Sequence, residues 1–80
     1  MKSVTVQYFA LLREQAGQSA ETVRTLAADA AALYEELRGR HRFSLDRGAL
    51  KVAINDDFAT WTTPLRDGDR VVFIPPVAGG

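Results

Sequence analysis

Cysteine is absent from the 80-residue sequence, and histidine occurs once, as His41. Without a thiol, the chain can form no disulfide, no thiolate metal site and no thiol-borne reaction intermediate. His41 stands between two arginines in a predicted loop, where a lone histidine is usually solvated, and no second metal ligand is near it in the sequence. We therefore expect no metal site, and any sulfur that the chain carries must sit on a group other than a side-chain thiol.

An excess of charge of one sign is also absent, because ten Lys and Arg residues balance ten Asp and Glu residues. This balance argues against nucleic acid or an anionic membrane surface as the main partner. Long apolar runs are missing as well, and Met1, Lys2 and Ser3 lead into an alternating segment without the pattern of a signal peptide. We expect no membrane partner and a cytoplasmic location.

Side-chain arrangements typical of an enzyme are missing too. The serines have no histidine and acid arranged around them, and the glycines before the C-terminal pair are isolated, so no phosphate-binding loop is predicted. The acidic pairs Asp56 with Asp57 and Asp67 with Asp69 stand between predicted strands, where such residues usually form turns. The side chains do not indicate an enzyme that works alone.

The sequence does contain clear strand and helix patterns. Apolar residues alternate over residues 3–9, 50–54 and 70–74, which is the period of half-buried strands. Apolar residues at helical spacing predict a helix from Asp29, the expected N-cap, to Arg38, with Gly39 as the expected stop. The shorter predicted elements are a helical turn over 10–16 closed by Gly17, a second strand over 20–24, a loop over 40–44, a turn over 55–57 and a short strand over 58–61.

This order of elements, β-β-α-β-β-β, predicts an α+β fold with one main helix on a mixed sheet. A chain of 80 residues with a strand at each end fits a β-grasp, or ubiquitin-like, domain, although another small α+β roll has the same order. We expect residues 1–74 to form the domain and residues 75–80 to form an extended C-terminal tail.

A single main helix can cover only one face of the sheet, so strand alternation divides the apolar residues into two sets. The set assigned to the covered face is Val4, Val6, Tyr8, Val71 and Phe73. The set assigned to the open face is Phe9, Val72 and Ile74, with Ala53 and Phe58. An exposed apolar patch is typical of a docking surface, and Arg13, Lys51 and Arg70 would surround it with positive charge. Alternatively, these residues form a second layer beneath the short helical turn and loops.

The C-terminal segment combines Pro75 and Pro76 with two small apolar residues and the pair Gly79 and Gly80. Proline has no amide donor, so the chain must leave the sheet at Pro75. Consecutive prolines favour a stiff, extended spacer, whereas glycine permits close approach of another backbone. The alternative is an ordinary disordered terminus. Because the segment has no charged side chain, we favour a stiff stalk whose slim tip presents the α-carboxylate of Gly80.

The α-carboxylate of Gly80 is ionised near neutral pH and is then a poor acyl electrophile. It becomes reactive when another protein uses ATP to convert it to an acyl-adenylate. Glycine at both final positions leaves room for the terminus to enter the active site of such a partner. A sulfur nucleophile would then yield a thiocarboxylate, and a lysine amine would yield a ubiquitin-type conjugate.

Several segments resemble one known family. Residues 71–80, Val-Val-Phe-Ile-Pro-Pro-Val-Ala-Gly-Gly, with Leu-Arg-Asp-Gly-Asp at residues 65–69, resemble the C-terminal signature of the MoaD family, the small subunits of molybdopterin synthase. Residues 8–14 followed by Gly17, and residues 52–55, resemble other segments of that family. One departure is Arg70, where the family often has an acidic residue. The resemblance therefore spans nearly the whole chain.

The resemblance implies a β-grasp sulfur carrier that binds no cofactor by itself and is a non-catalytic, sulfur-donating subunit. A MoeB-like adenylyltransferase would adenylate Gly80 with ATP as the nucleotide, and a sulfur donor protein with a persulfide would convert Gly80 to a thiocarboxylate. The tail would enter a MoaE-like large subunit, in a heterotetramer, and give sulfur to cyclic pyranopterin monophosphate for the molybdenum cofactor. Carried over by position, Gly79 and Gly80 form the reactive tail, and the partner-binding residues are Phe9, Arg13, Phe58, Ile74, Pro75, Pro76, Val77 and Ala78.

Two other functions fit the same C-terminal chemistry. One is a sulfur carrier for a different pathway, such as thiamine thiazole synthesis, cysteine synthesis or tRNA thiolation, although the Pro-Pro-Val-Ala lead-in favours molybdopterin synthase. The other is a ubiquitin-like modifier or a non-covalent binding module. A modifier would be found joined to target lysines, and a binding module would keep its affinity after loss of Gly80.

Overall fold

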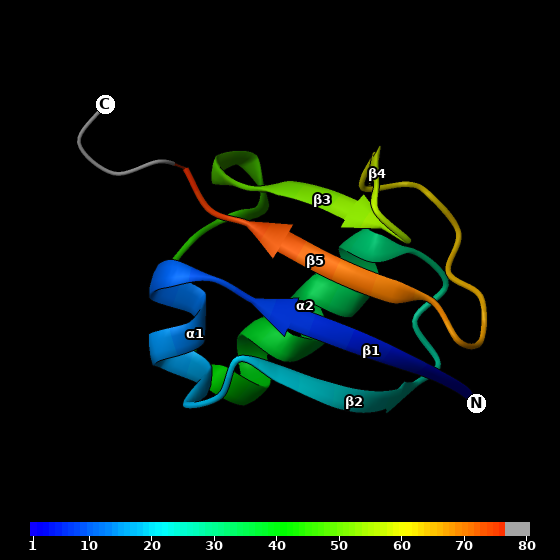
Figure 1. Cartoon of the computed structure of the whole chain (residues 1–80), viewed down its shortest axis with the longest axis horizontal. Helices are drawn as coiled ribbons and strands as arrows, with labels where there is room; N and C mark the ends of the chain where they lie inside the picture. Colours follow the sequence, from blue (N-terminus) through cyan, green and yellow to red (C-terminus); the bar gives the residue numbers. More distant parts are fainter. Residues whose placement is uncertain (77–80) are drawn as a thin grey trace.

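Two strands from opposite ends of the sequence, β1 (Lys2–Tyr8) and β5 (Arg70–Ile74), lie parallel at the centre of the sheet. They belong to a computed structural model that describes residues 1–76 of the chain (Figure 1). The five-stranded sheet has the order β2-β1-β5-β3-β4, and the other neighbouring strands are antiparallel. The remaining elements are α1 (Ala10–Ala16), β2 (Ala20–Thr25), α2 (Ala30–His41), the 3₁₀ turn η1 (Arg47–Ala49), β3 (Lys51–Ile54) and β4 (Asp57–Ala59). This is the predicted α+β arrangement of a β-grasp domain.

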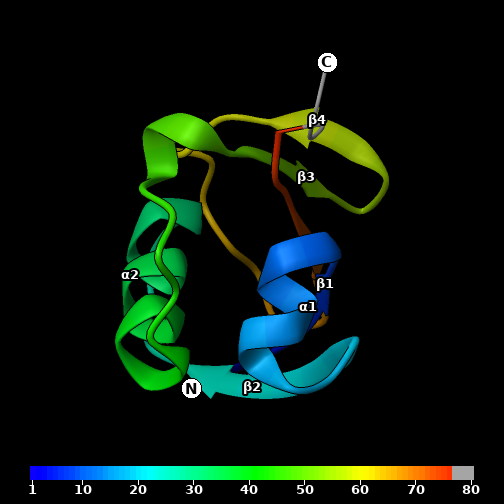
Figure 2. The ribbon, with the colours of Figure 1, turned by 90° about the vertical axis from the view of Figure 1, so that its left-hand side faces the viewer.

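Helix α2 lies across one face of the sheet, and the core forms between the two layers (Figure 2). The helix contributes Leu33, Tyr34 and Leu37, all of which are fully buried. The five residues that alternation assigned to the covered face, Val4, Val6, Tyr8, Val71 and Phe73, are buried as predicted. Full burial of such side chains stabilises the fold by about 1.5 to 3 kcal/mol each, so this layer supplies most of the stability.

The predicted start of α2 is confirmed, but its predicted end is wrong. Asp29 caps the helix, because its carboxylate accepts a hydrogen bond from the Ala32 amide at 2.8 Å. The helix does not stop at Gly39 and continues to His41, so the first two residues of the predicted loop are helical. The chain leaves the helix at Arg42, whose φ is 58°, and Phe43 then enters the core. The helix is extended because its last turn and Phe43 have tertiary partners on the sheet.

The bounds of four strands differ from the predictions by one or two residues: β1 begins at Lys2, β2 ends at Thr25, β3 begins at Lys51, and β4 is shifted. β1 ends at Tyr8, and Phe9 forms the N-cap of α1. The predicted short strand over 58–61 is β4, which begins at Asp57 and ends at Ala59. Trp61 leaves the sheet because its indole ring stacks on Phe73, with 5.8 Å between ring centroids. By contrast, β5 has the predicted bounds.

The short helix α1 connects β1 to β2 and closes as predicted at Gly17. Gly17 has a φ of 76°, and its amide donates to the Arg13 carbonyl at 3.0 Å. Within residues 1–76, no helix is long and apolar enough to cross a membrane.

Candidate functional site

The tail leaves the sheet at the end where α1 and the beginning of β3 also lie (Figure 1). β5 ends at Ile74, and Pro75 and Pro76 follow without regular secondary structure. Pro75 is half-buried and Pro76 is exposed. The other predicted tail residues, Val77, Ala78, Gly79 and Gly80, lie outside the described residues.

The strand register places an apolar surface on the sheet face opposite α2. Lys51 pairs with Ile74, and Ala53 pairs with both Val72 and Phe58. Directly paired residues share one face of a sheet. Val72, Ile74 and Ala53 are half-buried, and Phe58 is 77% exposed. We call Ala53, Phe58, Val72 and Ile74 the docking face. The exposure of Phe58 does not fit the second-layer alternative, whereas the other three residues are partly covered.

Phe9 and Arg13 reach solvent from a neighbouring element. Tyr8 pairs with Phe73, so Phe9 and Ile74 follow at the same end of the parallel central strands. Phe9 is 49% exposed, and Arg13 lies exposed on α1. The exposure predicted for Phe9 is therefore present, although Phe9 caps α1 and does not belong to β1.

A small apolar hollow of about 270 Å³ lies at the base of the tail. It is lined by Ala49, Lys51, Phe58, Ile74, Pro75 and Pro76. Four of the predicted partner-binding residues therefore meet in one place. Phe9 and Arg13 do not line this hollow.

The cations around the docking face are not equivalent. Arg70 forms an ion pair with Asp56 in the turn between β3 and β4, so its charge is already balanced. Arg13 and Lys51 are exposed and have no ion pair with another residue of 1–76. The positive charge available to a partner is therefore that of Arg13 and Lys51.

Residues 6–80 match a family described as the ThiS family. The chain belongs to the ThiS family. The molybdopterin synthase sulfur carrier subunit of Escherichia coli K12 is 35% identical over 80 residues, which cover 96% of this chain and 99% of that protein. The predicted family resemblance is confirmed.

Solved structures agree with the fold of this ThiS-family chain. SAMP1 from Haloferax volcanii has a TM-score of 0.80 at 28% identity, and the match covers 98% of this chain and 99% of that one. A complex of subunits 1 and 2 of molybdopterin-converting factor from Helicobacter pylori contains a chain with a TM-score of 0.67 at 28% identity, covering 98% and 99% of the two chains.

A polar cluster in this ThiS-family chain corrects the prediction for His41. The Glu21 carboxylate accepts a hydrogen bond from the Tyr8 hydroxyl at 2.5 Å and lies 2.6 Å from Nε2 of His41. The His41 side chain is only 13% exposed, so it is not a solvated loop residue. Burial acts to raise the pKa of Glu21, but the hydrogen bonds from Tyr8 and His41 outweigh it and hold that pKa below its ordinary value.

The same contacts also affect Tyr8. Burial, followed by the hydrogen bond to Glu21, raises the pKa of the Tyr8 hydroxyl. The cluster joins the end of α2 to β1 and β2 and lines none of the hollows described for this chain. We assign it a structural role. Among residues 1–76, no group of three or more His, Cys, Asp or Glu side chains could hold a metal ion.

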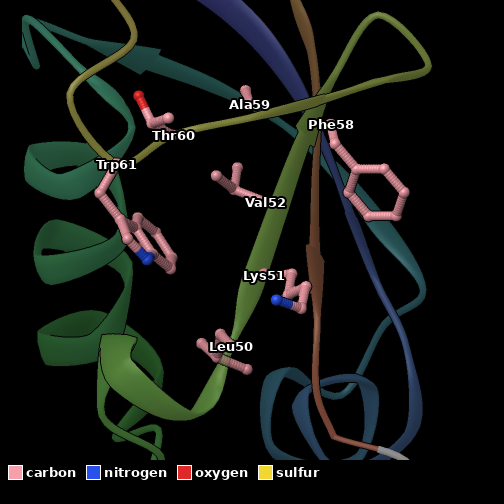
Figure 3. Close-up of a pocket in the computed structure, with 7 residues that line it drawn as sticks. All are labelled: Leu50, Lys51, Val52, Phe58, Ala59, Thr60 and Trp61. Atoms are coloured by element: carbon pink, nitrogen blue, oxygen red, sulfur yellow. The ribbon is translucent and has the colours of Figure 1, made fainter.

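Sequence reasoning missed a second hollow, which opens at the β3–β4 edge of the ThiS-family domain (Figure 3). It has a volume of about 570 Å³ and is lined by Leu50, Lys51, Val52, Phe58, Ala59, Thr60 and Trp61. We call it the edge groove. The single tryptophan, at the end of the short strand predicted over 58–61, was the only sequence signal for it.

Proposed function

We propose that this chain is the sulfur carrier subunit of a molybdopterin synthase. The observation that carries the proposal is the similarity to the Escherichia coli sulfur carrier subunit over 96% of this chain, and the ThiS-family match extends through the C-terminal segment to residue 80. The described structure supports it, because the docking face is exposed beside the point where that segment leaves the sheet.

The chemistry resides in the α-carboxylate of Gly80. A carboxylate oxygen attacks the α-phosphorus of ATP on an activating, MoeB-like partner, which releases pyrophosphate and forms an acyl-adenylate. A persulfide sulfur from a donor protein displaces AMP, and reduction of the sulfur–sulfur bond by a thiol leaves the thiocarboxylate. This group gives its sulfur to cyclic pyranopterin monophosphate, and two such transfers complete the dithiolene of molybdopterin.

The large, MoaE-like subunit is the partner that receives the tail. The Helicobacter pylori complex supports this assignment, because it joins subunits 1 and 2 of the molybdopterin-converting factor. We expect Phe9, Phe58 and Ile74 to lose solvent exposure in the complex and Arg13 to approach a carboxylate of the partner. The hollow at the base of the tail would then fix where Pro75 and Pro76 enter the large subunit.

The test is the intact mass of the protein after incubation with ATP, the activating enzyme and a sulfur source. We expect a shift equal to one oxygen replaced by sulfur, which disappears only when the large subunit and the pterin precursor are both added. A shift that persists with the pterin would indicate another thiolation pathway. Covalent joining to lysines of other proteins would indicate a modifier.

A further inference from the structure

The edge groove arises because β4 is shorter than the strand that it accompanies. β4 has three residues, and its last one, Ala59, pairs with Val52. Lys51 comes one position earlier in β3, and among the described strands it pairs only with Ile74 of β5. The sheet therefore ends early at this edge, and a hollow remains beside Leu50 and Val52, whose own side chains are buried.

The chain beyond β4 forms the opposite wall of the groove. The Thr60 amide donates to the Thr63 hydroxyl at 3.0 Å, which holds a tight turn away from the sheet. Trp61 then packs against Phe73 and Tyr34, with ring centroids 5.8 and 5.7 Å apart. Figure 3 shows Trp61 on one side of β3 and Phe58 on the other, with Lys51 beside the strand. The walls are thus apolar and are held by the core.

The edge groove is continuous with the docking face. Lys51 and Phe58 line both the edge groove and the hollow at the base of the tail. A partner that covers Phe58 and Ile74 must therefore also approach the mouth of the groove. Under the proposed function the tail enters that partner, which keeps the partner close to this side of the sheet.

The charge at the mouth of the groove limits what can occupy it. Lys51 makes no side-chain hydrogen bond or ion pair with another residue of 1–76, whereas Nζ of Lys2, the only other lysine, donates to the Ala27 carbonyl at 2.6 Å. A second copy bound symmetrically through the same patch would supply another Lys51 and no carboxylate, because neither the edge groove nor the hollow at the base of the tail is lined by Asp or Glu. A partner carboxylate would instead match the lysine.

We propose that the edge groove receives an apolar side chain of the large subunit, and that Lys51 pairs with a carboxylate next to that side chain. The proposal rests on the proposed function, since it adds a second contact to the same partner. A side chain that fills a well-packed, desolvated pocket contributes most of the binding energy at many interfaces, and a charge at the rim contributes mainly to the association rate and its salt dependence. This second contact would also fix how the domain is rotated relative to the large subunit, which the tail alone would not do.

The first test fills the groove from inside with Ala59→Leu. Ala59 shares the inner face with Val52, so the added carbon atoms enter the open groove and should not lower the melting temperature. We expect the dissociation constant for the large subunit, measured by isothermal titration, to rise about tenfold. The matched control is Ala20→Leu on the exposed edge of β2, which should bind as the wild type does.

The second test reverses the charge with Lys51→Glu, which changes an exposed side chain and should leave the fold intact. We expect binding to weaken about tenfold at low salt, with a smaller difference at high salt. Arg24→Glu on β2 is the matched control and should have little effect. Equal binding by the wild type and Lys51→Glu would overturn the charge pairing.

The third test uses Trp61, the only tryptophan, as a reporter. With 5-fluorotryptophan in this chain alone, its single fluorine resonance should shift when unlabelled large subunit is added to saturation. An unchanged resonance at saturation, or wild-type affinity of a folded Ala59→Leu variant, would overturn the groove assignment. A shift that depends on the concentration of this chain alone would identify a second copy as the occupant and would also overturn it.

The two proposals can fail separately. If Ile74→Ala weakens binding of the large subunit and Ala59→Leu does not, the docking face is retained and only the groove contact is wrong. If the wild-type chain shows no binding to the large subunit, both proposals are wrong.

Discussion

The two faces of β5 have different roles although they belong to one strand of five residues. On the inner face, Val71 and Phe73 are fully buried against the helix layer. On the outer face, Val72 and Ile74 are equally apolar but remain partly exposed in the described structure. Apolar side chains on the inner face are explained by the fold, whereas those on the outer face are not. The comparison teaches that one strand can serve the core with one face and leave an apolar surface with the other, which under the proposed function is covered by the large subunit.

The largest effect on function is expected from a change in the C-terminal tail, which follows β5 in the sequence. Deletion of Gly80 should abolish sulfuration. The shortened chain ends at Gly79, and its α-carboxylate lies one residue short of the position that the activating enzyme acts on. The melting temperature should hardly change. Intact mass after sulfuration and a thermal melt measure the two quantities, and a large fall in melting temperature would contradict the separation between fold and tail.

On the inner face, Phe73→Ala should lower the free energy of unfolding by about 3 to 5 kcal/mol, because it leaves a cavity beside Trp61 and Tyr34. Urea denaturation measures this change. If the loss were below about 1 kcal/mol, the inner face would not be the part of β5 that stabilises the fold.

On the outer face, Ile74→Ala should weaken binding of the large subunit about tenfold, because an apolar anchor is lost. The free energy of unfolding should fall by less than about 1.5 kcal/mol, because Ile74 is only half-buried. Titration calorimetry and urea denaturation of one preparation give both numbers. Thr22→Ala, on the exposed part of β2, is the control, and a stability loss as large as that of Phe73→Ala would remove the contrast between the faces.

The smallest effect concerns the polar cluster on the inner side. Because the pKa of Glu21 is lowered in the folded state, its stabilising contribution is present above the ordinary carboxyl pKa of about 4.3 and is lost as the pH falls through the lowered value. Glu21→Gln should therefore destabilise the protein at pH 7 and have less effect at pH 3. Chemical denaturation at both pH values tests this sign.

The control for the pH experiment is Glu14→Gln on α1. Glu14 is exposed and has no hydrogen bond or ion pair with another residue of 1–76. Its substitution should change stability little at either pH. A larger effect of Glu21→Gln at pH 3 than at pH 7 would show that the cluster does not stabilise the ionised carboxylate.

Local patterns predicted the features that depend on neighbouring residues. The alternation in β5 gave its bounds and its two faces, and Asp29 was correctly predicted as a helix cap. The exposure of Phe58 also followed from alternation, once one face had been assigned to the helix. These features depend on spacings of two to four residues, which the sequence shows directly.

Features that depend on distant partners could not be predicted in this way. The His41 side chain is only 13% exposed and lies 2.6 Å from Glu21, twenty residues earlier, and no local spacing indicates that pair. The edge groove depends on where β4 ends relative to β3 and on the packing of Trp61 against Phe73. Each of these requires the three-dimensional arrangement of strands that meet only after folding.

The central position of β5 has a consequence for synthesis of the protein. Before residues 70–74 have left the ribosome, the nascent chain can pair β1 with β2 and β3 with β4, but in the described sheet no strand pairing joins these two hairpins without β5. Contacts between distant segments form slowly, and unpaired strand edges are prone to aggregation in the meantime. The sheet is therefore completed only when its last strand arrives, so a chain interrupted before Arg70 should be recognised as unfolded and degraded before it can compete for a partner.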